Sequence, residues 1–179
     1  MTFRVHFYAE QAFLAQTKAM LDRGCSDEEP ETAAMCILAC VSAVEALTNS
    51  ILSKEINFRH FDELRITSKI EQIQIFGGTE PDWGNDPWQS VRRLIRMRNW
   101  LAHYKEYDIG LVNNDFEWTR DTENKAPRID PYRELTFENA KNYYDKSREA
   151  LYILVQNSGA NESNFDFLQT EQYMPFLVG

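Results

Sequence analysis

The side chains best suited to chemistry gather between Val91 and Lys105. Arg98 and His103 are separated by four residues, Asn99 directly follows the arginine and Tyr104 directly follows the histidine. An arginine stays charged and offers a planar fork to phosphate oxygens, whereas a histidine with a pKa near its usual value of about 6.5 exchanges protons at neutral pH. The combination predicts binding of a phosphate group with acid–base chemistry beside it.

RNA is a substrate that needs only these groups, because its own 2′-hydroxyl can attack the adjacent phosphorus without a metal ion. The reaction requires a group that removes a proton, a group that protonates the leaving oxygen and a cation that stabilises the charge on the phosphate. We expect His103 to act as acid and base, Arg98 to clamp the phosphate, and Asn99 to donate a hydrogen bond that positions either of them. No metal ion or cofactor is expected.

A single helix is predicted to carry these residues. Asp86 and Pro87 form a good helix opening, because an Asp accepts the first free N–H groups and proline lacks the donor that would be left over. Apolar residues then recur at helical spacing, and a polar and basic line recurs on the other side. The apolar stripe is Leu94, Met97, Leu101 and Tyr104, and the polar line is Arg92, Arg96, Asn99 and His103. We expect Arg92, Arg96 and Lys105 to bind RNA.

The spacing of Arg98 and His103 constrains the geometry of such a site. Five residues apart on an ideal helix, they point about 140° away from each other and lie about 7.5 Å apart along the axis. Either the helix ends or bends before His103, or a second copy of the helix completes the site across a two-fold axis. A symmetric dimer is the commonest oligomer.

Arg98, Asn99 and His103 lie late in the third or fourth helix expected for an all-helical chain of this size. They resemble the signature of the HEPN superfamily (higher eukaryotes and prokaryotes nucleotide-binding domains). The resemblance spans the helices from about residue 8 to 159. It implies a metal-independent endoribonuclease that leaves a 2′,3′-cyclic phosphate, a homodimer in which two motifs line one cleft, and a role as a toxin or phage-defence effector, with an antitoxin protein as a further partner. Tyr104 and Glu45 would support the site.

Two other interpretations fit the same residues. One is a HEPN-like domain without catalysis that binds a nucleotide, an RNA or a protein partner through the same cleft. The other is a plain helical dimer with an interaction tail. Under both, Arg98 is a structural arginine and His103 is a histidine that interacts favourably with the dipole at the helix end.

Glu45 interrupts the apolar run of the helix predicted over residues 30–54. That run covers a broad arc, which suits a central helix, and a carboxylate within it is costly unless it is paired. Glu45 therefore lies either at the edge of the buried arc or against a cation, for which Arg98 is the obvious candidate.

The whole chain is predicted to be an all-α, antiparallel bundle of about five helices spanning residues 1–159. A long irregular insertion at about 106–135 separates the motif helix from the last helix, with a short hairpin around Asn113 and Asn114. An excursion of this length is expected to cover a substrate cleft or a partner surface. The extension at 160–179 carries apolar anchors that dock onto the bundle or onto another chain.

Composition bounds these interpretations. A chain of 179 residues is enough for one core. The formal net charge of −9 opposes nonspecific attraction to nucleic acid, so RNA must bind locally, at the basic cluster of Arg92, Arg93, Arg96, Arg98 and Lys105. No apolar run approaches the roughly 20 residues that cross a bilayer and no secretory signal is visible, so we expect a cytoplasmic protein without a membrane partner. The three cysteines are expected to be small buried hydrophobes.

Overall fold

The computed structural model describes residues 8–24, 30–102, 109–112, 115–118 and 134–173. Within these ranges the longer elements are helices, and they pack into a bundle, which confirms the expected all-α class. The longer helices are α1 (Ala9–Asp22), α2 (Pro30–Lys54), α3 (Ile66–Phe76), α4 (Trp88–Ala102) and α6 (Phe137–Ser158). The shorter helices are η1 (Phe61–Glu63), η2 (Glu162–Phe165) and α7 (Phe167–Thr170).

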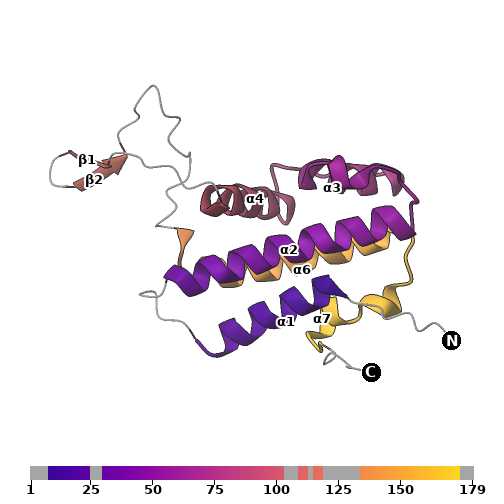
Figure 1. The fold of residues 1–179 in the computed structure, drawn as a ribbon, viewed down its shortest axis with the longest axis horizontal. Coiled ribbons are helices and arrows are strands. Elements are labelled where there is room, and N and C mark those ends of the chain that lie inside the picture. Colours follow the sequence, from indigo (N-terminus) through magenta and orange to yellow (C-terminus); the bar gives the residue numbers. More distant parts are fainter. Residues whose placement is uncertain (1–7, 25–29, 103–108, 113–114, 119–133, 174–179) are drawn as a thin grey trace.

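The bundle is arranged around two helices, α2 and α6, which lie side by side through its middle (Figure 1). Helix α1 packs on one side of this pair, and α3 and α4 follow one another along the other side. The core is formed mainly by aliphatic side chains of the central pair, such as Leu47, Leu52, Leu151 and Leu154, all of which are fully buried. The outer surface of α3 and α4 therefore faces away from the core.

Helix α2 is long and apolar enough to cross a membrane by length and composition, with a mean hydropathy of 1.8 over an 18-residue window. The expectation that no apolar stretch approaches this length is thus corrected. In the bundle, 61% of that window is buried, and α2 contacts α1, α3, α4 and α6. Packing on several sides accounts for the broad apolar arc, because each side of α2 that contacts another helix carries apolar residues.

Helix α4 begins at Trp88, one residue after the expected start. The Asp86 carboxylate accepts hydrogen bonds from the backbone N–H of Ser90 at 3.2 Å and from its hydroxyl at 2.7 Å, as expected for a residue that caps a helix. Leu94 and Met97 are buried as predicted, and Leu101 is half-buried. The helix is continuous to Ala102, so it neither ends nor bends sharply between Arg98 and that residue.

The insertion after α4 contains the predicted hairpin. Strand β1 (Ile109–Val112) pairs antiparallel with β2 (Asp115–Trp118), and Val112 faces Asp115 across the connection at Asn113 and Asn114. The insertion is therefore not irregular throughout. Its other residues up to 133 lie outside the described part of the chain.

The C-terminal extension was expected to dock either onto the bundle or onto another chain. The residues described, up to Tyr173, pack onto the bundle of their own chain. Phe165, Phe167 and Leu168 are buried. Arg148 of α6 donates hydrogen bonds to the carbonyls of Leu168 and Gln169 and pairs with the carboxylate of Glu171. The extension thus adds to the core rather than forming a free tail up to Tyr173.

Candidate functional site

A pocket of about 460 Å³ opens on the outer surface between α4 and the start of α3. This volume lies in the range of small-molecule sites. The polar lining is dominated by arginines, namely Arg65, Arg92, Arg96 and Arg98, and includes the carboxylate of Glu45. Leu64, Ile66 and Ile95 supply an apolar part of the lining. A chain with a net charge of −9 therefore carries a strongly cationic pocket.

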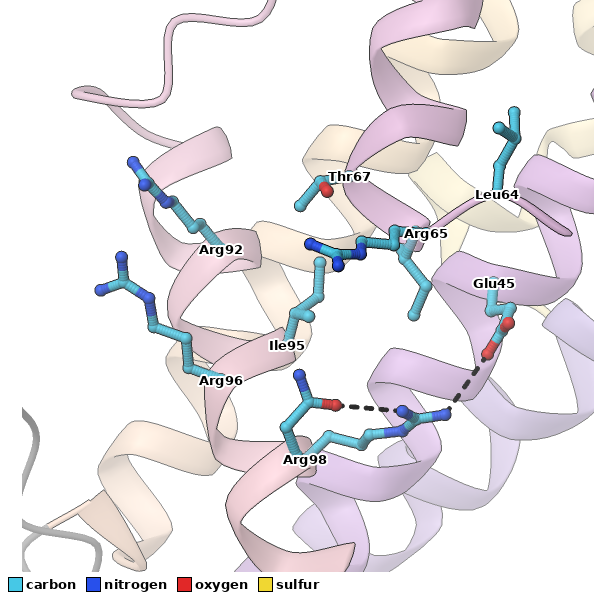
Figure 2. Close-up of a pocket in the computed structure, with 10 residues that line it drawn as sticks. Glu45, Leu64, Arg65, Thr67, Arg92, Ile95, Arg96 and Arg98 are labelled. Atoms are coloured by element: carbon cyan, nitrogen blue, oxygen red, sulfur yellow. Dashed lines mark hydrogen bonds and ion pairs between the residues drawn. The ribbon is translucent and has the colours of Figure 1, made fainter. Parts of the chain in front are cut away.

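Arg98 is held at one side of the pocket by two neighbours (Figure 2). Its Nη1 donates a hydrogen bond to Oδ1 of Asn99 at 3.0 Å, and its Nη2 lies 3.8 Å from Oε2 of Glu45. The predicted pairing of Glu45 with Arg98 is present. The role expected for Asn99 differs in one respect, because its amide oxygen accepts from the arginine and its Nδ2 is left to donate to a ligand.

A second cation contacts the same carboxylate from inside the bundle. The ammonium group of Lys69 lies 3.5 Å from Oε1 of Glu45, and the Lys69 side chain is only 2% exposed. Each oxygen of Glu45 thus faces one cation, and the buried lysine offsets the negative charge that would otherwise cancel the charge of Arg98. Lys69 was not predicted to belong to the site, although it lies between Ile66 and Ile73 at helical spacing on the buried face of α3.

Three other arginines of the pocket form no ion pair within the described residues. Arg92 and Arg96 are exposed, as predicted, and their guanidinium groups lie on the side of α4 away from Arg65 (Figure 2). The guanidinium group of Arg65 extends toward α4 and Ile95. Arg65 was not predicted to belong to the site, because it precedes α3 in a link whose sequence does not indicate which helix it faces.

Arg93 was expected to belong to the basic cluster, but its side chain pairs with Glu134 and does not line the pocket. It pairs with the carboxylate of Glu134, whose side chain is 8% exposed and whose other oxygen accepts a hydrogen bond from the hydroxyl of Tyr143 at 2.7 Å. Burial, and then this hydrogen bond to Glu134, raise the pKa of Tyr143 above its usual value. Arg93 therefore ties α4 to the chain that returns from the insertion, and it does not line the pocket.

The other predicted residues of the motif are not placed. His103, Tyr104 and Lys105 lie outside the described residues, directly after the end of α4 at Ala102. Their roles remain predictions. The described part of the chain holds no group of three His, Cys, Asp or Glu side chains that could bind a metal ion.

The cysteines described are buried, as predicted. Cys36 and Cys40 are fully buried in α2, while Cys25 falls outside the described residues. Burial raises the pKa of the Cys40 thiol to about 12, and the thiol lies 4.0 Å from the hydroxyl of Thr17. A thiol with so high a pKa carries very little thiolate at neutral pH and is chemically inert.

No protein-family model, curated protein or solved structure matches this chain significantly. The resemblance to the HEPN superfamily therefore rests on the motif at Arg98, Asn99 and His103 and on its position in a helical chain.

Proposed function

We propose that this protein is a HEPN-like endoribonuclease that binds single-stranded RNA in the pocket between α3 and α4 and cleaves it without a metal ion. The observation that carries the proposal is a pocket lined by four arginines on an acidic protein, two of which, Arg65 and Arg98, face the space between α3 and α4 (Figure 2). Phosphate contacts with Arg and Lys supply most of the affinity of nucleic-acid binding, and the net charge of −9 disfavours binding anywhere else on the surface.

Arg98 is suited to the role of phosphate clamp. Its side chain is 38% exposed, so it can reach a ligand, and its two partners restrict the orientation of the guanidinium group. A pre-oriented cation stabilises the charge that develops on the phosphate without having to reorganise during the reaction. The amide nitrogen of Asn99 can then donate to a second phosphate oxygen.

The proton transfers are assigned to His103. In the proposed reaction the 2′-oxygen bonds to phosphorus as its proton passes to a neutral imidazole, and the bond from phosphorus to the 5′-oxygen breaks as an imidazolium protonates that oxygen. The products are a 2′,3′-cyclic phosphate and a 5′-hydroxyl. We assign the second proton transfer to His103 of the partner subunit, in a composite site that two copies of the motif form across a homodimer.

The experiment is an RNA-cleavage assay in the presence of EDTA, with wild type and His103→Ala compared at equal concentration. Wild type is expected to cleave RNA and leave 2′,3′-cyclic phosphate ends, and His103→Ala to lose at least about 100-fold in rate, the effect expected of a general acid–base group. Expression in a cytoplasmic host should slow growth with wild type and not with His103→Ala. An antitoxin gene product would restore growth. Light scattering at micromolar concentration should give a dimer.

One observation favours a second candidate, a domain that binds RNA or a nucleotide and does not cleave it. Arg98 already pairs with Glu45 and donates to Asn99, as an arginine with a structural role would. Under this alternative, wild type and His103→Ala bind RNA equally and neither cleaves it.

A further inference from the structure

The wall of the pocket opposite α4 has no role in the proposed cleavage, yet it carries a cation. Arg65 immediately precedes α3, and Thr67 is the second residue of that helix. Both line the pocket, and the guanidinium group of Arg65 extends across it toward α4 (Figure 2). Arg65 has neither an ion pair nor a side-chain hydrogen bond with any residue in the described ranges, so its five donors are left for a ligand.

Arg92 and Arg96 do not duplicate this position. Their guanidinium groups lie on the far side of α4 from Arg65 (Figure 2). The cations that face the space between the two helices are therefore Arg65 on one wall and Arg98 on the other. Among the described residues, Glu45 is the one carboxylate in the lining, and it is shared with the buried ammonium of Lys69.

The surface between the two walls is apolar. The half-buried side chain of Ile95 lies between Arg65 and Arg98 (Figure 2), and Leu64 and Ile66 add to the apolar lining on the α3 side. The pocket thus offers a cation, an apolar surface and a second cation in that order. A ligand that matches this order has an anionic group at each end and an uncharged, partly apolar middle.

A nucleoside with a phosphate on each side has this form, and it is the repeating unit of an RNA strand. We propose that Arg65 and Thr67 form a second phosphate subsite, which holds the phosphodiester next to the one at Arg98 and leaves the nucleoside between them on Ile95. This assignment rests on the proposed RNA-binding function and adds the path of the strand, from α4 across to α3. Consecutive phosphates bound on opposite walls would fix the register of the strand at the scissile phosphate.

The test uses a fluorescent 2′-O-methyl oligoribonucleotide, which cannot be cleaved because the attacking hydroxyl is blocked. Its dissociation constant is measured by anisotropy over a range of salt concentrations for wild type, Arg65→Ala, Arg65→Lys, Arg98→Ala and the control Arg23→Ala. Arg23 is exposed at the end of α1, across the bundle from the pocket.

We expect Arg65→Ala to weaken binding about tenfold and to reduce the slope of log affinity against log salt by about 0.7, the contribution of one phosphate contact in a single strand. Arg65→Lys should keep the salt slope, since it keeps the charge, but lose part of the affinity with the planar fork. Arg23→Ala should bind as wild type does. In a second arm, wild type should bind adenosine 3′,5′-bisphosphate more tightly than adenosine 5′-monophosphate, and Arg65→Ala should bind the two equally.

Each opposing result overturns the subsite in a distinguishable way. If Arg65→Ala binds the oligonucleotide with wild-type affinity and salt slope while Arg98→Ala binds it weakly, the subsite is wrong and the proposed function stands. If wild type binds the bisphosphate but not the oligonucleotide, the pocket takes a free nucleotide and the RNA path is wrong. If wild type binds neither, the subsite and the proposed function are both wrong.

Discussion

The ammonium group of Lys69 lies 3.5 Å from Oε1 of Glu45, and the lysine side chain is buried while that of the glutamate is 36% exposed. Glu45 is the only anionic partner of Lys69 among the described residues, whereas Glu45 has Arg98 as a second cation. The two residues therefore depend on each other unequally. Removal of the carboxylate leaves a buried charge without a counterion, and removal of the lysine does not.

We predict from this inequality that Glu45→Gln lowers the free energy of unfolding by about 2 to 3 kcal/mol, less than the cost of breaking a fully buried pair because Glu45 is partly exposed. Lys69→Met, which fills a similar volume, should change it by less than about 1 kcal/mol. In the Lys69→Met background, Glu45→Gln should then cost less than about 1 kcal/mol. Urea denaturation of wild type, the two single variants and the double variant gives a double-mutant cycle. Additive changes in the free energy of unfolding would show that Glu45 and Lys69 are not coupled.

A second prediction concerns the contact that sets the position of α3, and with it one wall of the pocket. A methyl group at Gly77 would stand 2.6 Å from Cβ of Asn157 and 2.7 Å from its carbonyl oxygen, closer than such atoms approach. Asn157 also donates from Nδ2 to Oε1 of Gln74 at 2.9 Å, so it cannot move freely. We expect Gly77→Ala to destabilise the fold by roughly 1 to 3 kcal/mol in thermal or urea unfolding.

The matched control for that substitution is Gly84→Ala. The nearest atom to its added methyl group would be a carboxylate oxygen of Asp82 at 3.2 Å, at the end of an exposed side chain that can shift. A change below about 0.5 kcal/mol is expected there. Equal losses at the two glycines would refute the close packing of α3 on α6.

A third prediction concerns the C-terminal extension, which Arg148 attaches to α6. The Arg148 side chain is 12% exposed, pairs with Glu171, donates to two carbonyls and lies over the ring of Tyr144 at 5.5 Å from its centroid. We expect Arg148→Ala to cost about 2 kcal/mol, in the range of hydrogen bonds to charged groups, and to make the extension sensitive to limited proteolysis. Arg148→Lys should restore only part of the protection, because an ammonium cannot make the same set of bonds. Unchanged proteolysis of Arg148→Ala would contradict this role.

A fourth prediction concerns pH. Glu10 is 4% exposed, and its burial raises the pKa of its carboxyl above the usual 4.5, against the opposing effects of its own backbone hydrogen bond and of Lys54. The folded state therefore binds more protons than the unfolded state between the two pKa values, and stability falls as the pH rises through this window. Above the pKa that Glu10 has in the folded state, stability carries the full cost of burying its charged carboxylate.

Replacement of that carboxyl should remove the penalty. The unfolding free energy of Glu10→Gln relative to wild type should rise between pH 4 and pH 7, as measured by urea denaturation at each pH. Glu80→Gln, at an exposed position in the link between α3 and α4, should change the free energy by less than about 0.5 kcal/mol. If the unfolding free energy of Glu10→Gln relative to wild type falls toward neutral pH, burial does not raise the pKa of Glu10 and the prediction is wrong.

The features that sequence analysis predicted are those encoded locally. Helix α4 was predicted from an opening at Asp86 and a repeated apolar stripe, and the hairpin was predicted from the residue types at Asn113 and Asn114. The pairing of Glu45 with Arg98 was one of two alternatives, because a carboxylate beside an apolar arc either lies at the edge of the arc or needs a cation.

The features that were missed depend on which elements meet in space. Arg65 belongs to the pocket only because the start of α3 faces α4. Arg93 is drawn away from the basic cluster by Glu134, which is distant in the sequence. Lys69 is a different case, since helical periodicity placed it on the buried face of α3 and its charge alone argued against burial.

The most direct test of the account is the rate of RNA cleavage by Arg98→Ala in the presence of EDTA. Glu45 retains Lys69 in this variant, so the fold should be preserved, which circular dichroism can verify. We predict a loss of at least about 100-fold relative to wild type, as expected when a group that stabilises transition-state charge is removed, with Arg23→Ala as active as wild type. Cleavage by Arg98→Ala at the wild-type rate, or no metal-independent cleavage by wild type, would contradict the account.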